Sequence, residues 1–156
     1  MPLEIERKFL VRDDSWRAQV ESSSRIVQGY LSLDRHLTVR VRLRGDAAFL
    51  TLKGGAQGIC RSEFEYPIPP ADALAMLDTL AVAPPVDKVR HLIPVGGHLW
   101  ELDVFAGENA GLVMAEIELK SEGEAFERPD WLGDEVSEDP RYYNASLARY
   151  PFRRWR

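Results

Sequence analysis

The sequence predicts an α+β domain that is mainly β: an eight-stranded antiparallel closed β-barrel with a charged interior and helices packed outside. Three features indicate this architecture. Eight segments alternate apolar and polar residues, as half-buried strands do. Like charges recur at every second position of these segments, and three further segments show the spacing of amphipathic helices.

Length and composition indicate one globular domain spanning residues 1–156. Of the 156 residues, 45% are hydrophobic and 29% are charged, and no internal repeat or linker divides the chain. The net charge of −5 argues against a surface that holds duplex nucleic acid, so we expect no nucleic-acid partner. Cys60 is the only cysteine, which excludes an internal disulfide and a cysteine zinc cluster.

The sequence predicts no membrane partner and a cytoplasmic location. No segment approaches the roughly 20 apolar residues that a membrane-spanning helix needs. Met1 is followed by Pro2-Leu3-Glu4, without the basic start and apolar stretch of a secretory signal. A homodimer is compatible with the sequence but has no specific support in it.

The predicted strands are short and separated by turn residues. Gly45-Asp46 and Gly96-Gly97 lie between neighbouring strands and suit tight hairpins, so these neighbours should be antiparallel. The eight segments are 3–11, 25–33, 37–44, 48–53, 61–67, 87–95, 98–105 and 112–120.

Helical spacing marks three segments, 14–21, 71–80 and 142–150. In the second, Leu74, Leu77 and Leu80 recur every third residue and form one apolar side. Each helix therefore has an apolar face to bury, and we expect these faces to cover the outside of the barrel.

Charges of one sign share a face in most of the predicted strands. Residues two apart lie roughly 6.6 Å from each other on the same face, where like charges repel unless an opposite charge lies nearby. A single strand of this kind is typical of an ordinary solvated sheet face, but the recurrence is not. The pairs are Glu4/Glu6, Arg40/Arg42, Glu63/Glu65, Lys88/Arg90, Glu101/Asp103 and Glu116/Glu118.

Such a density of charge requires a wet cavity in which each charge finds a partner. We therefore expect the sheet to close into a barrel with these faces inward and the apolar faces outward. Clustered carboxylates suit a hard cation such as Mg²⁺ or Mn²⁺, and clustered Arg and Lys suit phosphate oxygens. The combination predicts a site for a phosphate compound and a divalent metal.

Motifs in order along nearly the whole chain resemble those of the CYTH proteins, or triphosphate tunnel metalloenzymes. The ExExK pattern of residues 4–8 is weak alone, but the ordered set is specific. The other matching segments are 28–31, 40–42, 52–54, 61–65, 88–90, 100–103, 115–118 and 139–144.

The resemblance implies an eight-stranded tunnel that binds triphosphate through basic residues and a divalent metal through acidic ones. The predicted phosphate ligands are Lys8, Arg40, Arg42, Lys53, Arg61, Lys88 and Arg90. Glu4, Glu6, Glu116 and Glu118 are the foremost predicted metal ligands. Further ligands, direct or through water, are Glu63, Glu65, Glu101 and Asp103.

The chain most resembles the family's bacterial inorganic tripolyphosphatases, which implies hydrolysis of tripolyphosphate to pyrophosphate and phosphate. That resemblance also implies a catalytic pair of Lys8 and Tyr30 near the reacting phosphate. Three alternatives remain open from the sequence. They are a class IV-type adenylyl cyclase, a thiamine triphosphatase, and a non-catalytic module that binds polyphosphate or phosphorylated RNA.

Overall fold

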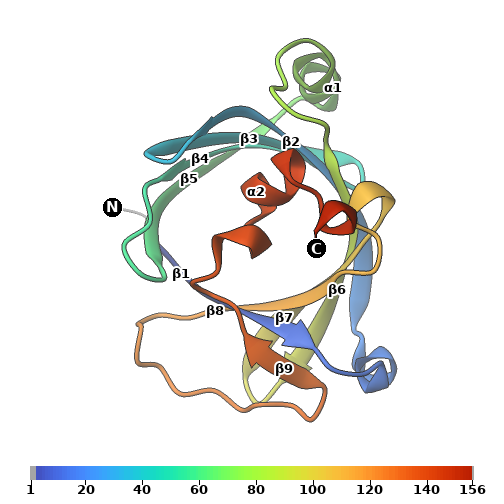
Figure 1. The fold of residues 1–156 in the computed structure, drawn as a ribbon, viewed down its shortest axis with the longest axis vertical. Helices are drawn as coiled ribbons and strands as arrows, with labels where there is room; N and C mark the ends of the chain where they lie inside the picture. The colour runs from blue at the N-terminus through green and yellow to red at the C-terminus, as the bar shows by residue number, and fades with distance from the viewer. Residues whose placement is uncertain (1–2, 156) are drawn as a thin grey trace.

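The computed structural model, which describes residues 3–155, contains the predicted closed antiparallel barrel (Figure 1). The strands follow one another around the ring in the order β5-β4-β3-β2-β6-β7-β8-β1, and β1 pairs with β5 to close it. The strands of the ring are β1 (Leu3–Val11), β2 (Ser22–Asp34), β3 (Leu37–Arg44), β4 (Ala47–Gly54), β5 (Cys60–Ile68), β6 (Val86–Val95), β7 (His98–Phe105) and β8 (Val113–Glu118).

The predicted strands are all present, with shifted ends. β2 begins at Ser22 because residues 22–24 pair with residues 90–92 of β6. The two glycine turns adopt left-handed backbone conformations, with φ of 57° at Gly45 and of 56° and 85° at Gly96 and Gly97. Tight antiparallel hairpins need this geometry, and it explains the glycines.

An additional short strand, β9 (Leu132–Glu135), was not predicted. It pairs with the end of β1, where Phe9 lies opposite Glu135 and Val11 opposite Leu132. β5 pairs with β1 only over Leu3–Ile5. β9 therefore takes over pairing with β1 beyond the point where β5 has diverged.

Two apolar clusters cover the outside of the barrel. One is built on Phe9, Trp100 and Ile117 and is covered by Trp16 of the 3₁₀ helix η1 (Ser15–Gln19) and by Trp131. The other lies under α1 (Pro70–Thr79), where Ala73 packs against the outer residues of β3 and β4. The predicted outward direction of the apolar strand faces is confirmed for these walls.

The last helix departs from the prediction that the helices pack outside. Part of the predicted segment 142–150 forms α2 (Asn144–Arg149), preceded by the 3₁₀ helix η3 (Pro140–Tyr142), and α2 lies within the ring of strands when the barrel is viewed end-on (Figure 1). Its Leu147 and Ala148 pack against an apolar cluster that includes Tyr30 and Met114.

The inner side chains explain this position of α2. Near this end of the barrel the inward positions carry Val86, Phe105 and Met114 rather than charges. The apolar face of α2 is therefore buried against the inside of the wall. A final 3₁₀ helix, η4 (Phe152–Arg154), follows it, and η2 (Gly107–Asn109) connects β7 to β8. No helix within residues 3–155 has the length and apolar character needed to cross a membrane.

Candidate active site

A cavity of about 750 Å³ lies in the bore of the barrel and gathers most of the predicted site residues. Every strand of the ring contributes at least one residue to the lining of the cavity. β6 contributes Arg90, and β7 contributes Glu101. The predicted residues that line it are Glu4, Glu6, Lys8, Tyr30, Arg40, Arg42, Lys53, Arg61, Glu63, Glu65, Arg90, Glu101, Glu116 and Glu118.

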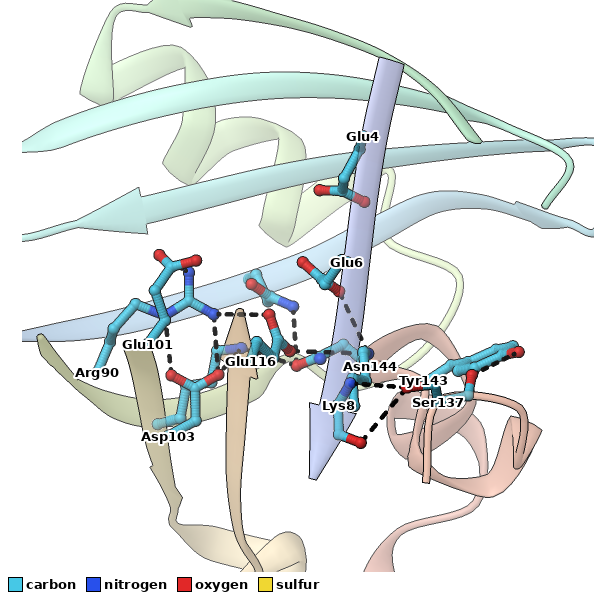
Figure 2. A network of polar contacts seen from close by, with 12 residues as sticks. Glu4, Glu6, Lys8, Arg90, Glu101, Asp103, Glu116, Ser137, Tyr143 and Asn144 are labelled. Atoms are coloured by element: carbon cyan, nitrogen blue, oxygen red, sulfur yellow. Dashed lines mark hydrogen bonds and ion pairs between the residues drawn. The ribbon is translucent and has the colours of Figure 1, made fainter. Parts of the chain in front are cut away.

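Lys88 and Asp103 are the two predicted residues outside the lining of the cavity. Both are fully buried, and Lys88 Nζ lies 2.7 Å from Asp103 Oδ2. Arg90 donates to the same carboxylate through Nε, at 2.8 Å, and through Nη2, at 2.9 Å. Figure 2 shows Asp103 beneath the guanidinium of Arg90, with Glu101 above that group and Glu116 to one side of it. Burial acts to raise the pKa of Asp103, but Arg90 and Lys88 lower it below its usual value.

The acidic side chains of β1 and β8 crowd one another. We call Glu4, Glu6 and Glu118 the acidic wall. Burial and the carboxylates of Glu116 and Glu4 raise the pKa of Glu6 well above its usual value. Burial, followed by Glu4 and Glu101, raises the pKa of Glu118. Burial and like-charged neighbours therefore both oppose full ionisation of this wall, and a bound cation would favour it.

Two lysines partly compensate the acidic wall. Lys53 Nζ lies 2.9 Å from Glu4 and 3.3 Å from Glu63. Lys8 Nζ lies 3.7 Å from Glu116 and 4.0 Å from Glu6. Burial acts to lower the pKa of Lys8, but the carboxylates raise it, so Lys8 is a charged ammonium.

Arg40 and Arg42, which we call the basic wall, lie on β3. Burial, Arg40 and Arg90 lower the pKa of Arg42 to about 10. Arg40 donates to Thr51 Oγ1 at 3.2 Å, and its buried Nε has no hydrogen-bond partner among the described residues. Positive charge is therefore concentrated here with few anions to balance it, which is an arrangement that favours binding of an anion.

The carboxylates are not already arranged as a metal site. Within residues 3–155, no three His, Cys, Asp or Glu side chains are gathered closely enough to hold an ion. Three of the carboxylates, Glu116, Glu4 and Glu101, are instead in ion pairs with Lys8, Lys53 and Arg90. The ligand chemistry nevertheless suits Mg²⁺ or Mn²⁺, because the candidates are all hard carboxylate oxygens.

The sequence prediction, which selected charged residues, missed neutral residues of the site. Gln28 is fully buried between Tyr30 and Arg42, and Thr51 bridges Arg40 and Glu65. Each lies two residues from a predicted site residue, on the same face of its strand, which is the signal that could have identified it. The C-terminal segment contributes Ser137, Tyr143 and Asn144, which are labelled near Lys8 in Figure 2.

Comparison with known proteins agrees with this architecture. The family pattern of the CYTH domain matches residues 2–149. The chain belongs to the CYTH family. This CYTH chain is 42% identical over 156 residues to the inorganic triphosphatase of Acetivibrio thermocellus, covering 100% of this chain and 99% of the relative. It is 39% identical over 153 residues to the inorganic triphosphatase of Nitrosomonas europaea, covering 93% and 96%.

Solved structures extend the comparison to the fold. The crystal structure of an inorganic triphosphatase superposes with a TM-score of 0.67 at 38% identity, covering 93% of this CYTH chain and 97% of the other. A Hippeastrum protein described as an adenylyl cyclase with a dominant triphosphatase activity has a TM-score of 0.56 at 16% identity, covering 76% and 80%. At that identity the likeness concerns the fold alone.

Proposed function

We propose that this CYTH domain is a divalent-metal-dependent hydrolase that splits inorganic tripolyphosphate into pyrophosphate and phosphate. The observation that carries the proposal is the juxtaposition, in one cavity, of a basic wall with too few anions and an acidic wall with too few cations. A phosphate chain would balance the first and its metal the second. The names of the two relatives above 35% identity support the same activity.

The phosphate chain would be held by the basic residues that line the cavity. Arg40 and Arg42 offer guanidinium groups suited to paired hydrogen bonds with phosphate oxygens, and Lys53 and Arg61 offer further donors. Lys88, which lies outside the cavity lining, would act on Asp103 and Asn144 rather than on the substrate. Because charge accumulates on the bridging oxygen as the bond to the terminal phosphorus breaks, these cations would stabilise the transition state.

The metal would be Mg²⁺ or Mn²⁺, held by carboxylates of the acidic wall and Glu116. CYTH triphosphatases are metal-dependent, and the donor set fits because it consists of hard oxygens whose mutual repulsion a cation would relieve. Glu63, Glu65 and Glu101 would complete the ligand set directly or through water. Both oxygens of Asp103 accept hydrogen bonds from Arg90, so we assign Asp103 to holding that arginine. When bound, such an ion would neutralise phosphate oxygens and lower the pKa of a bound water.

The protein's own chemical contribution would be mainly positioning. Lys8 and Tyr30 line the cavity and would contact the reacting phosphate, Lys8 as a permanent cation. Water would attack the terminal phosphorus in line with the bridging oxygen, and the bond between that phosphorus and the bridging oxygen would break. The products would be phosphate and pyrophosphate, with no covalent intermediate on the chain.

The test is to supply the purified protein with tripolyphosphate and Mg²⁺ or Mn²⁺ and to measure both products. We expect equal amounts of phosphate and pyrophosphate. Lys8→Ala should abolish product formation while the circular dichroism spectrum remains that of the folded barrel. Lys120→Ala, which removes an exposed lysine outside the cavity lining, should retain activity.

Two results would contradict the proposal. Parallel assays with ATP and thiamine triphosphate should yield less product, so cyclic AMP from ATP without phosphate release would identify a cyclase instead. Tight binding of tripolyphosphate without any product would indicate a binding module.

A further inference from the structure

Gln28 occupies a central position among the groups that the proposed function uses. It lies on β2, opposite Arg42 of β3 and Val86 of β6, and its side chain is completely buried. A buried amide that lacks hydrogen-bond partners is costly, so the contacts of Gln28 matter both for stability and for the groups that make them.

The chemistry of the neighbouring cations fixes the orientation of two amides. Arg42 Nε can only donate, and it lies 2.8 Å from Gln28 Oε1, so this atom must be the amide oxygen. Burial and the neighbouring arginines lower the pKa of Lys88 to about 7, but Asp103 at 2.7 Å favours the ammonium, which can likewise only donate, and Lys88 Nζ lies 2.9 Å from Asn144 Oδ1. Both amide oxygens are therefore assigned by partners that have no acceptor.

This orientation determines how Tyr30 is bound. With its oxygen facing Arg42, Gln28 presents its NH₂ group to Tyr30 Oη at 3.0 Å and to Asn144 Oδ1 at 3.3 Å. An amide nitrogen only donates, so the Tyr30 oxygen is the acceptor. Among residues 3–155 the Tyr30 hydroxyl donates no hydrogen bond, and Tyr30 lines the cavity.

We propose that Gln28 is a positioning residue, which holds the Tyr30 oxygen so that the phenolic proton is directed into the cavity. Tyr30 then donates a hydrogen bond to a phosphate oxygen and does not accept a proton from the attacking water. This inference rests on the proposed function. It also explains the contribution of α2, because Asn144 connects the Gln28 amide to Lys88 and thence to Asp103.

The sharpest variant is Gln28→Glu, which keeps an acceptor for Arg42 but presents an oxygen to Tyr30. The phenolic proton should then be donated to the carboxylate rather than to the cavity. We expect kcat to fall about tenfold or more, as when a group that orients a reacting residue is changed. KM should rise as well, because the new carboxylate partly offsets the charge of Arg42, so the positioning of Tyr30 is judged from kcat.

A second variant separates positioning from a merely structural role. Gln28→Met removes all three hydrogen bonds of the Gln28 side chain and leaves Arg42 Nε without an acceptor, so a structural role predicts that it is the more damaging change. Positioning predicts the opposite order for kcat, since in Gln28→Met the phenolic proton remains free to reach the substrate. Gln19→Glu controls for the change in the net charge of the protein: the side-chain oxygen of Gln19 accepts from Trp131 outside the bore, and kcat should not change.

The decisive measurement is the same substitution in a Tyr30→Phe background. If Gln28 acts through the hydroxyl, Gln28→Glu should lower kcat there by much less than in the wild type. An equal loss in both backgrounds would overturn the proposal, as would a larger loss for Gln28→Met than for Gln28→Glu.

Failure of the proposed function would be recognised separately. If the wild type releases no phosphate, the function fails, and neutron diffraction then tests the hydrogen-bond direction without activity. A deuteron on Tyr30 directed into the cavity supports the assignment, and one directed at Gln28 overturns it.

Discussion

The two walls of the cavity gather charge of opposite sign, and neither is balanced from within. Strands β3 and β8 lie four positions apart in either direction around the ring, so Arg40 and Arg42 lie across the bore from Glu118. Burial and like-charged neighbours lower the pKa of Arg42 to about 10 and raise the pKa of Glu118. Asp103, in contrast, is buried more completely but has two cations on its carboxylate.

The difference shows which buried charges serve the fold and which await a ligand. An ion pair that satisfies its own members, such as Asp103 with Arg90, holds the walls of the barrel in place. A wall whose members repel one another weakens the fold until something of opposite sign binds. Removing a charge from the internal ion pair should therefore lower stability most, whereas removing one from a wall should lower activity most.

The largest effect should come from removing the metal. We expect EDTA to abolish release of phosphate from tripolyphosphate, and Mg²⁺ or Mn²⁺ to restore it. Because the ion binds the folded acidic wall, it should also stabilise the protein without substrate, by about 2.7 kcal/mol at a concentration about 100 times its Kd. Thermal unfolding with and without the metal measures this effect.

A matched pair of variants assigns that stabilisation to the acidic wall. Glu118→Gln should reduce the metal-dependent rise in melting temperature. Asp78→Asn removes an exposed carboxylate from α1 on the outside of the barrel and should leave the rise intact. A rise that survives Glu118→Gln and disappears with Asp78→Asn would place the ion elsewhere.

The next largest effect should distinguish the ion pair of Asp103 and Arg90 from the basic wall. Asp103→Asn should cost about 3–5 kcal/mol of unfolding free energy, because Arg90 and Lys88 remain buried without their carboxylate. Arg40→Met should change the unfolding free energy much less, since losing the contacts with Thr51 and with Glu65 at 3.5 Å is offset by relief of the repulsion with which Arg40 lowers the pKa of Arg42. Activity should nevertheless fall about 100-fold in Arg40→Met, because a transition-state contact is lost.

Urea unfolding in EDTA, compared with the assay in Mg²⁺, checks both halves of this prediction. Equal destabilisation by Asp103→Asn and Arg40→Met would show that both residues are structural, and the distinction between the walls and the internal ion pair would not hold.

The sequence predicted the ring and the sign of each wall because alternation along a strand determines which side chains lie on the same face. Alternation does not determine depth along the bore. It could therefore not separate Glu101, which lines the cavity, from Asp103, which is sealed beneath Arg90. The four residues of β9 are too few to show a period.

The placement of α2 was wrong for a related reason. Helical spacing identifies an apolar face but not the surface that buries it, and here that surface is the inside of the barrel, around Met114. Gln28 carries no charge, so a prediction based on like-charged pairs did not identify it, even though it lies on the same strand face as Tyr30.

The smallest effect should come from an ion pair on the outer side of β1. Arg7 donates to Glu135 through Nε at 2.9 Å, and this hydrogen bond is the main reason that the pKa of Glu135 lies below its usual value. Both side chains are partly exposed, at 21% and 33%, so water and salt screen the pair. Glu135→Gln should therefore cost within about 1 kcal/mol of unfolding free energy at neutral pH.

The pH dependence of this cost identifies its origin. A carboxyl whose pKa is lowered in the folded state stabilises the protein above its unfolded pKa of about 4.3, and the stabilisation is lost as the pH falls through the folded pKa. The difference in melting temperature between wild type and Glu135→Gln should thus shrink from pH 7 to pH 3, while Glu21→Gln, at an exposed position before β2, should show little difference at either pH. Glu135 also accepts from Ser137 Oγ, which in turn accepts from the backbone N–H of Lys8. A cost that is large and independent of pH would mean that this chain of hydrogen bonds, rather than the ion pair, couples the outside of β1 to the lysine in the bore.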